Sequence, residues 1–128
     1  MSTKEIEDDP SIPNDETLYR QVPPIHRGAD GKPTSAAFQN HPDYEAFSVI
    51  LDSILRESGR TPEDLLFPGY EIWSFTAGQA RDLGQKIVRR PEETERAHGH
   101  VVGPKKKKVK RGFKACSVRA AVAPPISS

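Results

Sequence analysis

Residues 67–103, FPGYEIWSFTAGQARDLGQKIVRRPEETERAHGHVVG, contain the pattern that decides the fold. The segment at 70–75 carries aromatic and branched side chains, and Trp73 and Phe75 fall on the same side of it. Side chains of this kind suit a half-buried pleated surface. We therefore expect a short strand here, followed by the elements that the rest of the stretch specifies.

A helix is expected directly after that strand. The sequence Thr76-Ala77-Gly78-Gln79 has the form of a capping box, in which the hydroxyl accepts from an early helical N–H and the glutamine reaches back. The predicted helix covers residues 77–83, and Gly84 is the expected left-handed terminator. Two further strands are expected at 86–89 and at 98–102. The stretch therefore reads strand, helix, strand, strand.

The N-terminal half contains one clear strand and one ambiguous apolar segment. Residues 17–22 alternate apolar and polar side chains, and the proline pair at 23–24 closes this expected strand. Apolar residues between 47 and 55 follow helical spacing and predict a helix. A competing interpretation makes 46–49 a strand and starts the helix nearer Leu51. The sequence leaves both interpretations open.

Three more elements complete the predicted order. Residues 61–66, TPEDLL, have a threonine cap followed by proline at the first helical position, which predicts a helix. A helix is expected at 106–115, where Val109 and Phe113 are four residues apart and would anchor one face. A last strand is expected at 117–122.

Mixed elements joined by short connections favour an α+β fold, with helices packed on a small, mostly antiparallel sheet. The length of 128 residues fits one domain, which we place at residues 17–122. Residues 1–16 are acidic and nearly free of bulky apolar groups, and this composition predicts a disordered arm. Residues 123–128 are expected to form a flexible tail.

The composition also indicates the cellular compartment of the protein. No run of about 18 apolar residues occurs, so no membrane-spanning helix is expected. The first ten residues, MSTKEIEDDP, lack the apolar region of a signal peptide. The single cysteine, Cys116, can form no internal disulfide and fits a reducing compartment. These features predict a cytoplasmic protein without a membrane partner.

Several short segments resemble small bacterial proteins of unassigned function. The segments are LYRQVPP at 18–24, SAAF at 35–38, FSV at 47–49, RTPEDLL at 60–66, SFTAGQARDLGQKIVRRP at 74–91 and AHGHVVG at 97–103. The resemblance covers residues 18–122. It implies a bacterial origin and a strand at FSV, and it implies no particular activity.

The basic run PKKKKVKRGFK, at 104–114, is the most conspicuous charge feature. The net charge of +1 hides it, because acidic residues gather before Leu18. Such cations can neutralise several phosphates and give salt-dependent, sequence-tolerant binding to nucleic acid or another polyanion, and Phe113 would pack or stack. The alternative is a solvated helix face. The expected contact residues are Lys105, Lys106, Lys107, Lys108, Lys110, Arg111, Phe113 and Lys114.

His98 and His100 form the second candidate site. Alternate residues of a strand face the same side, at about 6–7 Å from each other. With Arg89 or Arg90 nearby, one imidazole could accept a proton while the other donates one, as in metal-independent RNA cleavage. This would make the chain a small histidine-dependent nuclease or toxin-like hydrolase. The alternative is a structural pair at a strand edge.

Motifs for metal or cofactor binding are not found in the sequence. No Cys-x-x-Cys, His-Glu-x-x-His or phosphate-binding glycine loop occurs, so we expect neither a metal nor a cofactor. A third interpretation is a protein–protein adaptor subunit, in which the basic run meets an acidic protein. The sequence ranks a small non-enzymatic binding or accessory protein first, the nuclease second and the adaptor third.

Overall fold

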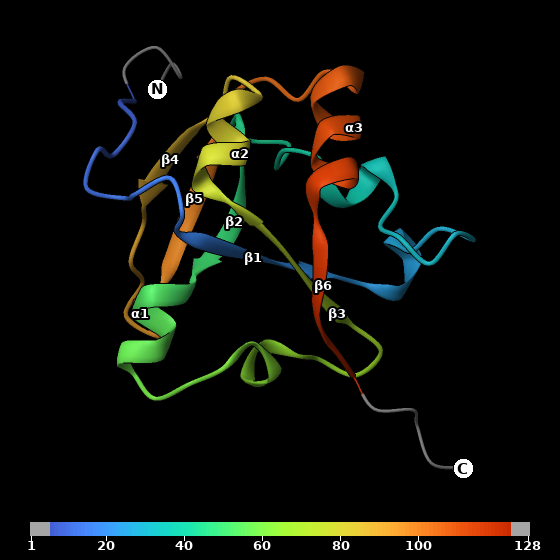
Figure 1. Ribbon diagram of the computed structural model, residues 1–128, viewed down its shortest axis with the longest axis horizontal. Coiled ribbons are helices and arrows are strands. Elements are labelled where there is room, and N and C mark those ends of the chain that lie inside the picture. Colours follow the sequence, from blue (N-terminus) through green and yellow to red (C-terminus); the bar gives the residue numbers. More distant parts are fainter. Residues whose placement is uncertain (1–5, 124–128) are drawn as a thin grey trace.

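Six strands form one sheet in the computed structural model, which describes residues 6–123 (Figure 1). The strand order is β4-β5-β2-β1-β3-β6, and all neighbouring strands are antiparallel. The strands are β1 (Thr17–Val22), β2 (Ala46–Leu51), β3 (Glu71–Thr76), β4 (Lys86–Arg89), β5 (His98–Val102) and β6 (Val118–Val122). The expected α+β architecture, with helices on an antiparallel sheet, is confirmed.

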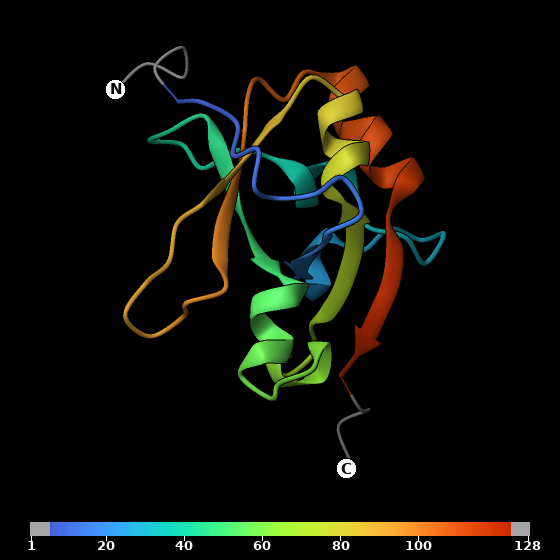
Figure 2. The same ribbon diagram turned by 60° about the vertical axis from the view of Figure 1, so that its left-hand side comes forward.

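Three helices pack on the sheet. They are α1 (Asp52–Glu57), α2 (Ala77–Asp82) and α3 (Lys107–Cys116). The turns η2 (Pro24–His26), η3 (Ser35–Phe38) and η4 (Pro62–Leu65) are short 3-10 helices. Figure 2 shows α2 and α3 side by side, with α1 at the opposite end of the molecule. The helix expected at 61–66 is therefore only the single turn η4, because Pro68 leaves no room for a longer one.

The main apolar cluster lies between the sheet and the pair α2 and α3. Its centre is a group of four phenylalanines, in which the Phe113 ring lies 4.8 Å from Phe75, 5.4 Å from Phe47 and 5.6 Å from Phe38. A second cluster, which includes Tyr19, Leu55 and Ile72, lies against α1 and η4. Because side chains alternate along each strand, the two clusters occupy opposite faces of the sheet.

The ambiguous segment at 46–55 is a strand followed by a helix. Strand β2 pairs with β1 on one side and β5 on the other, and α1 begins at Asp52. Five of the six residues of β2 are buried, so both faces of the strand are apolar. Apolar and polar residues therefore do not alternate along β2, which explains why the spacing of its apolar residues resembles that of a helix. The interpretation with a strand at 46–49 and a helix nearer Leu51 is correct.

The capping box before α2 is present as expected. The Thr76 hydroxyl accepts from the Gln79 N–H at 3.1 Å, and the Thr76 N–H donates to Gln79 Oε1 at 2.9 Å. Gly84 follows the helix with a φ of +79°, a left-handed conformation that favours glycine. This local pattern fixes the turn from β3 into α2 and then into β4.

The N-terminal segment differs from the disordered arm predicted for residues 1–16. Within the described part, Ile12 is 1% exposed and belongs to the main apolar cluster. The Ile87 N–H donates to Asp8 Oδ1 at 2.8 Å, and the Asp9 N–H donates to the Ile87 carbonyl at 2.9 Å. The arm thus covers the free edge of β4, because its acids find partners there. Residues 1–5 and 124–128, with most of the expected tail, lie outside the described residues.

Candidate functional site

The basic run becomes helix α3, and its burial decides which cations are available. Phe113 is fully buried, and Val109 and Cys116 pack beside it against the main cluster. The apolar residues therefore occupy one side of the helix. Lys107 and Arg111, one turn apart, are exposed on the opposite side.

Phe113 cannot serve as a stacking surface for a base. Its side chain is 0% exposed, and its ring is stacked on Phe38 with an interplanar angle of 18°. The packing role that the sequence also allowed is the one the structure shows. The surface of α3 therefore offers no aromatic ring for a base to stack on. It can recognise a ligand only by its charge.

Lys105 is also turned inward. Its ammonium donates to the carbonyls of Val101 and Gly103 at 3.1 and 2.7 Å, and it lies 5.1 Å from the centre of the Phe47 ring. Burial, together with the positive charge of Arg20, lowers the pKa of Lys105 to about 7. Lys105 is thus a poor candidate for a phosphate contact.

The remaining cations differ in whether they have acidic partners. Lys114 pairs with Asp30 at 3.2 Å. Five cations have no ion pair with a residue in the described part of the chain: Lys106, Lys107, Lys108, Lys110 and Arg111. By contrast, Arg27, Arg56, Arg60, Arg81, Arg89 and Arg119 each pair with a carboxylate. We call the five unpaired cations the α3 cation cluster.

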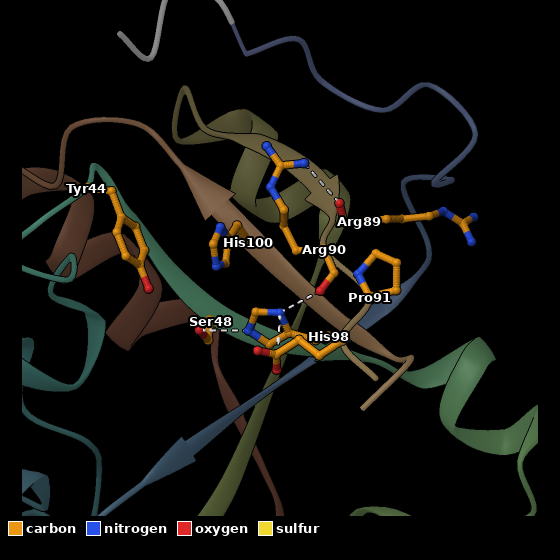
Figure 3. Close-up of a pocket in the computed structure, with 8 residues that line it drawn as sticks. Tyr44, Ser48, Arg89, Arg90, Pro91, His98 and His100 are labelled. Atoms are coloured by element: carbon orange, nitrogen blue, oxygen red, sulfur yellow. Dashed lines mark hydrogen bonds and ion pairs between the residues drawn. The ribbon is translucent and has the colours of Figure 1, made fainter. Parts of the chain in front are cut away.

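The two candidate histidines lie in a pocket on the other face of the sheet (Figure 3). His98 and His100 alternate with Gly99 and Val101 on β5, so they point away from the main apolar cluster. The pocket is open and has a volume of about 620 Å³. Its lining residues are Tyr44, Ser48, Arg89, Arg90, Pro91, Glu92, His98 and His100. We call it the histidine pocket.

His98 uses both ring nitrogens within the protein. Its Nδ1 lies 2.8 Å from the Arg90 carbonyl, and its Nε2 lies 3.0 Å from the Ser48 hydroxyl. A neutral ring with its proton on Nδ1 satisfies both contacts, since Ser48 then donates to Nε2. The Glu92 carboxylate is 3.8 Å from Nδ1. This arrangement holds the ring in place and ties the end of β4 to β2.

His100 has a different setting. Its ring stacks on Tyr44 with centroids 5.3 Å apart, and Tyr44 stacks in turn on His41 at 4.3 Å. Burial lowers the pKa of His100 to about 4, with smaller contributions from the neighbouring His98 and Arg90. At neutral pH the imidazole is therefore uncharged. The Tyr44 ring is thus stacked on two histidines within the protein.

The two arginines of the predicted histidine site are separated by the structure. Figure 3 shows the Arg89 side chain extending away from the two histidines. It pairs with Asp9 at 3.4 Å. Arg90 lies over the pocket and donates to the Arg89 carbonyl at 3.2 Å. Arg90 therefore replaces Arg89 as the basic residue beside His100.

The geometry of the histidine pocket does not favour a mechanism in which one histidine accepts a proton and the other donates one. The rings of His98 and His100 are 5.0 Å apart and nearly perpendicular. His100 is uncharged at neutral pH, and the ring nitrogens of His98 contact the Arg90 carbonyl and the Ser48 hydroxyl, with the Glu92 carboxylate 3.8 Å from Nδ1. His98 therefore has no ring nitrogen free to reach a substrate, and the uncharged His100 is not a proton-donating imidazolium. The nuclease therefore stays a prediction from the sequence: both histidines and Arg90 line one pocket, but their hydrogen bonds and charge states do not favour it.

Sequence reasoning did not place Tyr44, Ser48 or Pro91 beside the two histidines. Ser48 pairs with His100 in the register of β2 and β5, which places its hydroxyl beside His98. The contact between Ser48 and His98 joins positions 50 residues apart, and no local pattern encodes it. Tyr44 precedes β2 in a loop, where its position depends on the stack with His41 and His100.

The described residues contain neither a metal-binding cluster nor a membrane-spanning helix. Among residues 6–123, no three or more histidine, cysteine or acidic side chains gather in a way that could hold a metal ion. In the same residues, no helix has the length and apolar character needed to cross a membrane. No protein-family model, curated protein or solved structure matches this chain. The resemblance to small bacterial proteins therefore stays a sequence-based prediction.

Proposed function

We propose that this chain is a non-enzymatic binding protein that contacts a polyanion, namely nucleic acid, through the α3 cation cluster. The observation that carries the proposal is the lack of acidic partners for five cations, four on α3 and one directly before it, in a protein that pairs most of its other arginines. Charges that are not neutralised internally are available to phosphates.

The composition of the surface predicts the mode of recognition. Lysine and arginine contacts to phosphate position a protein on nucleic acid but carry no sequence information. The exposed side of α3 contains no asparagine, glutamine or aromatic residue, because Phe113 faces the core. We therefore expect binding that tolerates base sequence and that weakens steeply with salt. A cytoplasmic location and the lack of a cofactor also stay predictions from the sequence.

The proposal is tested by a pair of charge-matched double variants. Lys107→Gln with Arg111→Gln removes two exposed cations from α3. The control, Arg56→Gln with Arg96→Gln, removes two exposed cations from α1 and the β4–β5 connection. Fluorescence anisotropy with a labelled duplex should show that the α3 variant binds at least about tenfold more weakly than the wild type at low salt. The control should bind nearly as the wild type does.

Two results would count against the proposal. Equal loss in both variants would mean that net charge, and not α3, sets the affinity. Retention of a specific acidic protein without any nucleic-acid binding would favour the adaptor. The nucleic acid recovered from the same samples should be intact, and cleavage that depends on His98 or His100 would revive the nuclease.

A further inference from the structure

Polar groups without partners converge on the histidine pocket. The Tyr44 hydroxyl and the ring nitrogens of His100 make no hydrogen bond to the described residues. The Arg90 guanidinium makes a single hydrogen bond, to the Arg89 carbonyl, and no ion pair within that same range. These groups come from the loop before β2, from the end of β4 and from β5. They are mainly hydrogen-bond donors.

The acceptors around the pocket are largely used by the protein itself. The Arg90 carbonyl and the Ser48 hydroxyl both contact the ring of His98. Those two contacts hold the backbone of Arg90 close to β2. They also leave the guanidinium above the pocket, as Figure 3 shows. His98 is thus a positioning residue, since it orients Arg90 and has no free nitrogen of its own.

The charges on the pocket wall are unequal. Arg90 supplies one positive charge, whereas Arg89 is neutralised by Asp9. Glu92 supplies one negative charge, but its side chain is 58% exposed and can turn into solvent. Asp43 and Glu45 line a smaller adjoining hollow of about 230 Å³, which Tyr44, Arg90 and His100 also line. Asp43 and Glu45 do not line the histidine pocket itself, so the side of this pocket next to Arg90 is the one suited to an anion.

We propose that the histidine pocket binds the oxyanion group, phosphate or carboxylate, of a small molecule. Arg90 supplies the charge and a forked donor, while His100 and Tyr44 supply an N–H and an O–H. The open pocket of about 620 Å³ leaves room beside the oxyanion for an organic body. That body lies against Ser48 and Pro91. This site is separate from the α3 cation cluster and does not depend on it.

A metal cation is the alternative ligand of the histidine pocket. Glu92, His98 and His100 line the same pocket, but they do not form a metal-binding group within the described residues. Both nitrogens of His98 are engaged, and Arg90 would repel a metal ion. The geometry consequently favours an anion over a cation.

The experiment is an NMR titration of the full chain with inorganic phosphate, glycerol 3-phosphate and acetate, each at constant ionic strength. The signals followed are the His100 ring and the Arg90 Nε–H. We expect saturable shifts at both residues. Stronger binding of glycerol 3-phosphate identifies a phosphate ester, and stronger binding of acetate identifies a carboxylate. Saturable shifts with zinc chloride in place of these anions would overturn the proposal.

Three variants locate the binding. Arg90→Gln should weaken it about ten- to hundredfold, because a charge-assisted hydrogen bond is lost. Glu92→Gln should strengthen it, because a repelling charge is removed. The double variant Lys107→Gln with Arg111→Gln should bind as the wild type does. Shifts that persist unchanged in Arg90→Gln, or the absence of saturable shifts in the wild type, would overturn the proposal. Histidine signals outside the pocket show that each variant is folded.

Discussion

At the scale of single residues, two cations lie against one aromatic ring. The Cζ atom of Arg20 is 4.8 Å and the Nζ atom of Lys105 is 5.1 Å from the centre of Phe47. Arg20 donates to the carbonyls of Ala37 and Ser48. Burial lowers the pKa of Arg20 to about 10 and that of Lys105 to about 7. These cations are held by backbone dipoles and a ring face, so they stabilise the fold instead of facing solvent.

His100 should make stability depend on pH. Its folded pKa of about 4 is below the ordinary value of 6.5, so between these values the unfolded chain binds more protons. Stability is therefore fully present above about pH 6.5 and falls as the pH drops towards 4. Because solvent screens a half-buried ring, we expect the loss to be about 1–2 kcal/mol.

Urea denaturation at several pH values checks this effect. The variant His100→Gln should have a flatter stability profile than the wild type between pH 6.5 and 4. Identical profiles would mean that the ring is protonated at no cost in the folded protein. NMR titration of the His100 ring measures the pKa directly.

At the scale of elements, Gly112 sets the contact between α2 and α3. A Cβ atom built at Gly112 would overlap the side chain of Leu83, just after α2. A glycine within a helix costs about 1 kcal/mol relative to alanine. The φ angle at Gly112 is not left-handed, so the backbone conformation does not require glycine there. The close approach of α3 to Leu83 explains why a glycine is present despite this cost.

The exchange Gly112→Ala should therefore lower stability, by about 1 kcal/mol or more, although alanine favours a helix. In a chain that already carries Leu83→Ala, the same exchange should raise stability, because the overlap is gone. Thermal denaturation of the single and double variants gives the coupling between the two sites. Additive effects of the two exchanges would contradict this account of the contact.

The elements themselves were predictable where their signals are local. The capping box of α2 and the spacing of Val109 and Phe113 in α3 depend on neighbours within one turn. Strand β2 was ambiguous because its burial on both faces depends on pairing with β1 and β5. The order of the N-terminal arm was missed for the same reason: Asp8 finds its partners more than 70 residues away, on α2 and β4, and Ile12 belongs to the main apolar cluster.

At the scale of the whole molecule, the sheet separates two surfaces. Helix α3 lies over one face, and the histidine pocket opens on the other face, across β4, β5 and β2 (Figures 1 and 3). The basic cluster could be found from the sequence because its residues are contiguous. The histidine pocket could not be predicted from the sequence, because Tyr44, Arg90 and His100 come together only when the strands pair. Variants at one surface should thus leave the other intact.

The salt dependence of duplex binding tests the central claim most directly. If the α3 cation cluster contacts phosphates with all five side chains, a plot of log affinity against log salt should have a slope of about −4 to −5. Loss of Lys107 and Arg111 should reduce the magnitude of the slope by about 2. A slope near zero, or no binding at low salt, would contradict the proposal that α3 is a polyanion-binding surface.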